Sequence, residues 1–198
     1  MTVPGAPAVS PRTRGTARAG RAGWQGVGVD TAPVEHLVVM GVSGTGKSSV
    51  GRGLAARLDR TFVEGDDLHP AANVAKMSSG TALTDEDRWP WLEAVRDAMT
   101  AHARAGRSTV TACSALRRVY RATLTQAQGR VRFVLLDVPP ELLRERVARR
   151  TGHWMPPSLL DSQLAVLEAL QTDEDGVTVH VRGDVDATVT EALRLLRS

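Results

Sequence analysis

The sequence predicts an α/β fold in which helices cover both faces of a central parallel sheet. From about residue 36, segments rich in β-branched residues alternate with helical patterns. The first of these segments is continuously apolar, as expected for a strand that is buried on both faces. A glycine-rich stretch then separates it from the first helical pattern. Together these observations predict a three-layer α/β/α arrangement with five parallel strands and a small helical lid.

The glycine-rich stretch, residues 41–48, matches the phosphate-loop pattern G-x-x-x-x-G-K-[ST] without a gap. Its glycines let the backbone turn tightly and approach an anion. The loop amides and the start of the following helix then bind the phosphate oxygens. This pattern, placed between a strand and a helix, indicates a fold of the P-loop NTPase type that binds ATP. The predicted ATP-binding residues are Gly41, Val42, Ser43, Gly44, Thr45, Gly46, Lys47, Ser48 and Ser49.

Two side chains of the loop have specific predicted roles. Lys47 is expected to reach the β- and γ-phosphates. Ser48 offers a hydroxyl to the Mg²⁺ that accompanies the nucleotide, because a hard cation takes oxygen ligands. ATP and Mg²⁺ are therefore the predicted cosubstrate and metal.

The remaining elements follow in order along the chain. Residues 84–87 form a capping segment ahead of a long helix that ends near His102. The predicted strands are 37–42, 61–64, 108–113, 131–137 and 177–181. The other predicted helices run from the phosphate loop to about residue 60, from Pro70 to Met77, after Ser114, from Pro140, over 157–170 and over 187–196.

The length and composition predict one folded domain, residues 31–198, after an extension of residues 1–30. The extension is rich in Gly, Ala, Pro, Thr and Arg and cannot bury a core, so it is expected to be disordered. It could also reflect the choice of start codon. Its arginines resemble those of an organellar transit peptide, but the extension has no clear amphipathic helix.

Charge and apolar patterning restrict the partners. Residues 1–30 carry four arginines and one aspartate, which accounts for the formal net charge of +3 and leaves the domain neutral. A neutral domain lacks the basic surface that nucleic-acid binding needs. No apolar run approaches the roughly 20 residues that span a bilayer, so no membrane association is expected. The single cysteine, Cys113, fits a reducing compartment, and the cytoplasm is the predicted location.

Acidic residues end two of the predicted strands. Asp66 follows the second strand and should lie close to the γ-phosphate, because ligands of open α/β sheets bind beyond the carboxyl ends of strands. It could accept the proton of an attacking hydroxyl or hold a metal-bound water. His69 lies near the same mouth. Asp137, which ends the fourth strand, is a candidate Mg²⁺ ligand or an ordinary turn residue.

Two groups of arginines follow strands. Residues 117–121 hold three arginines, of which at least one could face an anionic ligand, although such a run is ordinarily a solvated face. Four more arginines lie in residues 144–150, just before a Gly- and Pro-containing stretch at 152–157. They indicate a lid around residues 150–165 that brings a cation to the transferred phosphoryl group. Surface salt bridges are the alternative for this second group.

Several further segments combine with the phosphate loop and Asp66 into one recognisable set. The segments are 41–48, 65–70, 73–77 with Gly80 and Leu83, 85–92, 112–116 with Tyr120 and Arg121, and the later positions His153, Met155, Pro156, Leu160, Ser162, Gln163, Leu167 and Glu168. Together they resemble the gluconate kinases, P-loop enzymes with a nucleoside-monophosphate-kinase-like fold, over residues 36–198. The resemblance implies transfer of the ATP γ-phosphoryl group to the 6-hydroxyl of D-gluconate, in a homodimer.

The resemblance also implies roles for individual residues. Asp66 would activate the hydroxyl, and Lys47 and the lid residue Arg150 would complete the catalytic set. The residues implied to bind gluconate are Asp66, His69, Lys76, Arg121 and His153. Two other functions remain open at this point. One is a related kinase of another small acid such as shikimate, and the other is a non-catalytic nucleotide-binding module, which the neutral domain disfavours.

Overall fold

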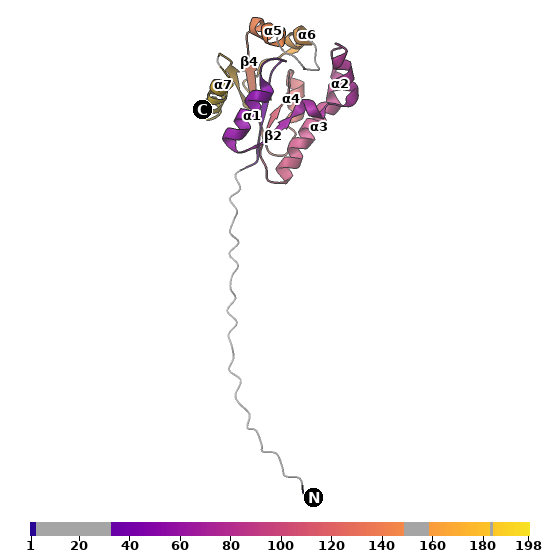
Figure 1. Ribbon diagram of the computed structural model, residues 1–198, viewed down its shortest axis with the longest axis vertical. Helices are drawn as coiled ribbons and strands as arrows, with labels where there is room; N and C mark the ends of the chain where they lie inside the picture. Colours follow the sequence, from indigo (N-terminus) through magenta and orange to yellow (C-terminus); the bar gives the residue numbers. More distant parts are fainter. Residues whose placement is uncertain (3–32, 149–158, 183) are drawn as a thin grey trace. The chain divides into compact units, whose positions relative to one another are not determined.

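The structure, a computed structural model, describes residues 1–2, 33–148, 159–182 and 184–198. Within the unit of residues 31–198, five parallel strands form one sheet in the order β2-β3-β1-β4-β5. Figure 1 shows this unit with strands β2 and β4 labelled. The strands are β1 (Glu35–Met40), β2 (Thr61–Glu64), β3 (Thr109–Ala112), β4 (Arg130–Asp137) and β5 (Gly176–His180). The predicted five-stranded parallel sheet is confirmed. The extension predicted to be disordered lies outside the described residues, apart from residues 1 and 2.

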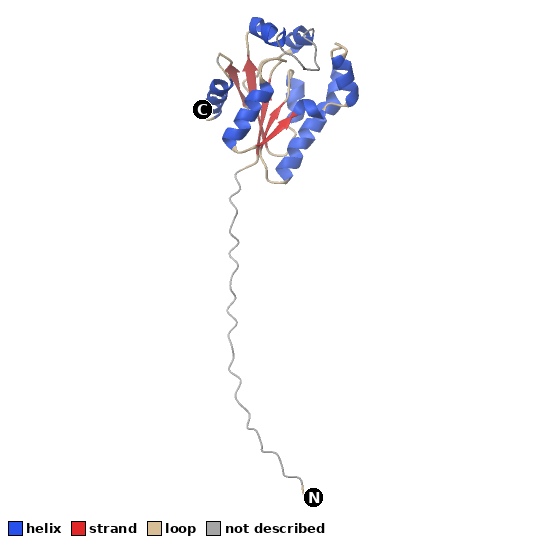
Figure 2. Cartoon of the chain, in the orientation of Figure 1, coloured by secondary structure: helices blue, strands red, loops and turns tan. Residues whose placement is uncertain are grey.

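Helices connect the strands, as Figure 2 shows. No helix in the described part of the chain is both long and apolar enough to cross a membrane. The helices are α1 (Lys47–Leu58), α2 (Ala71–Ser78), α3 (Asp85–Arg104), α4 (Arg118–Leu124), α5 (Pro140–Ala148), α6 (Leu159–Val166) and α7 (Val185–Leu196), and a short 3₁₀ helix, η1 (Gly65–Leu68), follows β2.

The three layers follow from the alternation of side chains along the buried central strand. Leu37 and Val39 of β1 pack into a core that includes residues of α1 and α7 on one face of the sheet. Val38 and Met40 pack with residues of α3 and α4 on the other. Both faces of β1 are therefore covered, which explains its continuous apolar sequence.

The strand order places a site between β1 and β3. The chain leaves the central strand β1 for the edge strand β2, returns to β3 and then crosses to β4 on the other side of β1. Ligands of open α/β sheets bind at such a switch point, beyond the carboxyl ends of the strands. The loops after β1 and β3 also contact one another there, because the Gly41 amide donates to the Ser114 carbonyl over 3.2 Å.

The capping prediction for α3 is confirmed. Thr84 accepts from the amide of Asp87, and the Asp87 carboxylate accepts in return from the amide of Thr84. This reciprocal pair satisfies two amides that the first turn of a helix leaves without partners.

The helix expected over residues 157–170 ends earlier than predicted, at Val166. Beyond it, the Glu168 amide donates to the Leu116 carbonyl over 2.8 Å. The guanidinium of Arg121 donates to the carbonyls of Glu168 and Ala169. The backbone groups that would continue the helix are thus bound to the loop after β3 and to α4. The apolar pattern that suggested a longer helix arises because Leu170 still packs against the core.

Candidate active site

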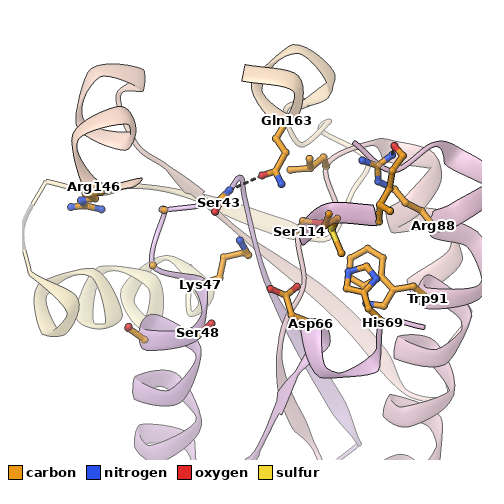
Figure 3. Close-up of a pocket in the computed structure, with 16 residues that line it drawn as sticks. Ser43, Lys47, Ser48, Asp66, His69, Arg88, Trp91, Ser114, Arg146 and Gln163 are labelled. Carbon is orange, nitrogen blue, oxygen red and sulfur yellow. Dashed lines mark hydrogen bonds between the residues drawn. The ribbon is translucent and has the colours of Figure 1, made fainter. Parts of the chain in front are cut away.

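A cavity of about 290 Å³ lies beyond the carboxyl ends of β1, β2 and β3 (Figure 3). It combines loop glycines, a lysine, a carboxylate, an imidazole and two arginines. The residues that line it are Ser43, Gly44, Gly46, Lys47, Ser48, Ser49, Asp66, His69, Met77, Leu83, Arg88, Trp91, Ser114, Leu116, Arg146 and Gln163.

The phosphate loop has the backbone shape that its sequence predicts. Gly44 and Gly46 have φ values of 84° and 94°, in the left-handed region that favours glycine. A Cβ atom at Gly44 would also lie 2.8 Å from a methyl carbon of Val147 on α5. Gly46 caps α1, and Lys47 is its first residue. The loop therefore presents its amides at a helix N-terminus, where anions are stabilised.

Two contacts define how the loop meets its surroundings. The Lys47 ammonium donates to the Val42 carbonyl over 3.1 Å, which keeps the side chain over the loop. The Ser43 amide donates to the Gln163 carboxamide oxygen over 2.7 Å, and Figure 3 marks this bond. Gln163 belongs to α6, so one amide of the loop is bound by a side chain of the helix above the cavity.

Asp66 reaches the cavity from η1, and the backbone before it is held from two sides. Gly65 packs so closely on β3 that a Cβ atom there would lie 2.3 Å from the Ala112 carbonyl oxygen. The buried indole of Trp91 donates to the Gly65 carbonyl over 2.7 Å. In Figure 3 the side chains of Asp66 and Lys47 extend into the same space from neighbouring walls. The structure thus places a proton acceptor beside a phosphate-binding loop.

His69 lies against the same indole. The rings of His69 and Trp91 are stacked, with centroids 4.1 Å apart and planes 15° apart. Burial lowers the pKa of His69 to about 4, while Asp66 opposes this shift and Arg88 adds to it. The imidazole is therefore neutral near pH 7. Its Nδ1 atom is buried and has no hydrogen-bond partner among the described residues, which suits contact with a ligand hydroxyl.

This lowered pKa predicts a pH-dependent stability. The unfolded chain protonates His69 near pH 6.5 and the folded protein only near pH 4, so the free energy of unfolding should decrease as pH falls between these values. We expect His69→Gln to reduce the decrease from pH 7 to pH 5 by on the order of 1 kcal/mol. Urea unfolding of both proteins at the two pH values measures this. An identical decrease in both proteins would contradict the prediction.

Oxygen ligands for a metal ion are present at the loop. The Ser48 hydroxyl lines the cavity, and Glu64 at the end of β2 lies nearby. Burial raises the pKa of Glu64, while the Ser48 hydroxyl and Arg52 act in the opposite direction. No cluster of three or more His, Cys, Asp or Glu that could hold a metal occurs in the described ranges. One hydroxyl fits Mg²⁺, which commonly takes one or two protein ligands besides phosphates and water.

The structure does not bring Asp137 into the cavity. Its carboxylate contacts the His180 imidazole over 2.7 Å, across the neighbouring strands β4 and β5, and both side chains are largely exposed. Asp137 is not among the residues that line the cavity. The alternative reading of this aspartate, as an ordinary strand-end residue, fits the structure better.

The structure does not place Arg121 in the cavity, although the resemblance implied that it would line the gluconate pocket. Its side chain is 1% exposed and forms two bonds to the Glu174 carboxylate, of 2.5 and 2.8 Å. Its other donors bind backbone carbonyls on both sides of α4. Arg121 therefore joins α4 to the segment after α6 and faces the core. Its pairing with Glu174 holds the pKa of that carboxyl below its ordinary value.

Lys76 also lies elsewhere than expected. Its ammonium contacts both oxygens of Asp87, over 2.8 and 2.6 Å, and so joins α2 to the first turn of α3. It does not line the cavity, whereas its neighbour Met77 does. Arg150, His153 and the first part of the expected lid lie outside the described residues.

Eight residues that line the cavity had no individual role predicted from the sequence, and Arg88, Trp91, Arg146 and Gln163 are among them. Arg88 and Trp91 are three residues apart, so they share one face of α3, and that face lines the cavity. Arg146 belongs to the arginine cluster that suggested a lid, and this clustering was its signal. Gln163 is one of the positions that carry the family resemblance, but no local pattern indicated its contact with the phosphate loop, because that contact joins residues 120 positions apart.

A phosphate loop and a facing carboxylate in one cavity of this fold define an ATP-dependent kinase of the P-loop type. A family model described as an AAA domain matches residues 37–170. A gluconokinase from Gluconobacter oxydans (strain 621H) is 49% identical over 158 residues, which cover 80% of this chain and 89% of that protein. The chain belongs to the gluconokinase family, within the proteins that the AAA-domain model describes.

Solved structures agree with this assignment. A sugar kinase from Janibacter sp. HTCC2649, determined without ligand, is 46% identical with a TM-score of 0.80 and covers 83% of this chain and 95% of its own. A gluconokinase from Sinorhizobium meliloti 1021 is 44% identical with a TM-score of 0.74, over 82% of this chain and 91% of its own. Both similarities extend over more than four fifths of this chain.

Proposed function

We propose that this protein transfers the γ-phosphoryl group of ATP to the 6-hydroxyl of D-gluconate, giving 6-phospho-D-gluconate and ADP. The observation that carries the proposal is the single cavity that holds both Lys47 of the phosphate loop and the carboxylate of Asp66. The gluconokinase relatives support the choice of acceptor.

The arrangement of these groups suggests how the reaction proceeds. The loop amides and Lys47 bind the triphosphate and hold its terminal phosphorus at the mouth of the cavity. The acceptor oxygen attacks that phosphorus, and its proton passes to the Asp66 carboxylate. The bond between the γ-phosphorus and the β,γ-bridging oxygen breaks, and ADP departs with that oxygen. Neutral His69 contacts acceptor hydroxyls without adding charge.

The proposal includes Mg²⁺ as the metal. Ser48 is the protein ligand we assign to it, since its hydroxyl lines the cavity one residue after Lys47. When bound, the ion offsets the negative charge of the phosphate oxygens. The chain's own contribution is to present that hydroxyl at the N-terminus of α1.

We also propose a homodimer in the cytoplasm. The homodimer follows from the resemblance to gluconate kinases. The location is supported by the lone cysteine, Cys113, which is buried and cannot form a disulfide within the chain. Light scattering coupled to size exclusion measures the oligomeric state.

A coupled assay tests the activity. Purified protein with ATP, Mg²⁺ and D-gluconate is expected to form ADP and 6-phospho-D-gluconate in equal amounts. Without an acceptor only slow ATP hydrolysis is expected, because a productive site requires the acceptor hydroxyl. Turnover of shikimate or another acid from a panel, with no turnover of gluconate, would contradict the proposal. A rate of ATP hydrolysis that none of the acids changes would also contradict it.

A further inference from the structure

Arg88 is the cation on the acceptor wall, which we define as the cavity-lining residues Asp66, His69, Met77, Leu83, Arg88 and Trp91. Two other cations line the cavity in the described part of the chain, Lys47 in the phosphate loop and Arg146 on α5. Figure 3 shows Arg88 beside the His69 and Trp91 rings, and Arg146 on the far side of the phosphate loop. Arg88 therefore differs from the other two in its position.

The Arg88 guanidinium is fixed in place. One of its terminal nitrogens donates to the Leu83 carbonyl over 2.5 Å, across the start of α3. The guanidinium carbon lies 5.7 Å from the centre of the Tyr120 ring. The bond to Leu83 uses one terminal nitrogen of the planar group, and Arg88 forms no other hydrogen bond among the described residues.

The carboxylate best placed to pair with Arg88 is bound to other groups. Asp85 precedes Arg88 by three residues on α3, a spacing that commonly supports an ion pair. Its oxygens instead accept from the Arg117 guanidinium and the Tyr120 hydroxyl. In the described ranges Arg88 has no ion-pair partner. A half-buried arginine without a carboxylate is a favourable site for an anion from outside the chain.

The acceptor wall carries a negative group, Asp66, and a positive group, Arg88, at different positions. Asp66 repels a carboxylate and accepts from a hydroxyl, whereas Arg88 attracts a carboxylate. The two other cations expected to bind the acid are already paired, Arg121 with Glu174 and Lys76 with Asp87. We propose that Arg88 binds the carboxylate of the acceptor and so orients the molecule with its terminal hydroxyl toward Asp66. This inference rests on the proposed function and names the residue that selects an acidic acceptor.

The test compares two acceptors that differ only at the acid group. D-gluconamide has the hydroxyls of D-gluconate but carries a neutral amide in place of the carboxylate. We expect the wild type to prefer gluconate in kcat/KM by about 10- to 100-fold, the range for a hydrogen-bonded charge pair. Arg88→Met should lose most of this preference while its kcat/KM for gluconamide and its KM for ATP change little. Arg88→Lys should keep part of the preference, because it retains the charge without the planar fork.

A matched control and the outcomes complete the design. Arg118→Met removes an exposed arginine of α4 that pairs with Asp173 and does not line the cavity, so its preference should equal that of the wild type. Thermal unfolding checks that each variant is folded, and Arg88→Lys carries the test if Arg88→Met does not fold. Equal losses with gluconate and gluconamide, or a full preference in the folded Arg88 variants, would overturn the inference alone. A wild type that phosphorylates neither compound would refute the proposed function and the inference with it.

Discussion

Asp66→Asn is expected to lower kcat by about 10²- to 10⁴-fold, the usual contribution of a positioned general base. Asparagine keeps the size of the side chain but cannot take the proton of the acceptor hydroxyl at neutral pH. The indole of Trp91 and the close packing of Gly65 on β3 hold the backbone, so the fold should survive the change. Steady-state rates with varied gluconate and ATP measure the effect, and the KM for ATP should stay within a few-fold of wild type.

The neighbouring residue provides the control for this substitution. Asp67 belongs to the same 3₁₀ helix, is exposed and does not line the cavity. Asp67→Asn removes the same charge at almost the same place and should leave kcat near the wild-type value. If the two variants lost activity equally, the loss would come from the combined negative charge of Asp66 and Asp67. The role of Asp66 as proton acceptor would then be wrong.

The second large effect is expected for Lys47→Met, which should lower kcat/KM for ATP by about 10²- to 10³-fold. The methionine fills a similar volume but removes the charge that we propose contacts the β- and γ-phosphates. Nucleotide affinity measured by calorimetry should fall more for ATP than for ADP, since ADP lacks the γ-phosphate. Thermal unfolding should remain close to wild type, because the lysine's hydrogen bond to the Val42 carbonyl lies at the cavity surface.

Lys76 is the chain's only other lysine, so its substitution serves as a control. It removes the same charge as Lys47→Met, but at a position that does not line the cavity. Its ammonium pairs with Asp87 away from the cavity, so Lys76→Met should retain turnover and lose only the contact between α2 and α3. A large loss of kcat in this variant, with stability preserved, would contradict the structure's placement of Lys76.

The parts of the site that the sequence predicted are those in which the determining residues are adjacent. The phosphate loop is one contiguous pattern between a strand and a helix, so its position followed directly. Asp66 and His69 followed from a topological rule, because parallel strands deliver their carboxyl ends to one edge of the sheet. Local pattern and global fold agree at these positions, and sequence reasoning succeeds where they agree.

The parts that failed depend on contacts between distant segments. Whether Arg121 faced the ligand or the core depended on Glu174, 53 residues later, which no local pattern connects to it. Lys76 was misplaced for the same reason, since its partner Asp87 lies on the next helix. Arg88 went unassigned because its availability depends on where Asp85 binds, and that in turn depends on Arg117 and Tyr120. The role of a charged helix residue can be assigned only when the other groups that could pair with it are known.

The hydrogen bond between the Ser43 amide and Gln163 of α6 means that a bound phosphate and Gln163 compete for one proton donor of the phosphate loop. A backbone amide has a single hydrogen, so a phosphate oxygen that accepts it from Ser43 must replace the carboxamide of Gln163. The same helix packs Leu159 against Met77 and Leu83 on the acceptor wall. We therefore expect nucleotide binding and binding of the acid to be coupled through α6, and because such linkage is reciprocal, each ligand should change the affinity for the other by the same factor.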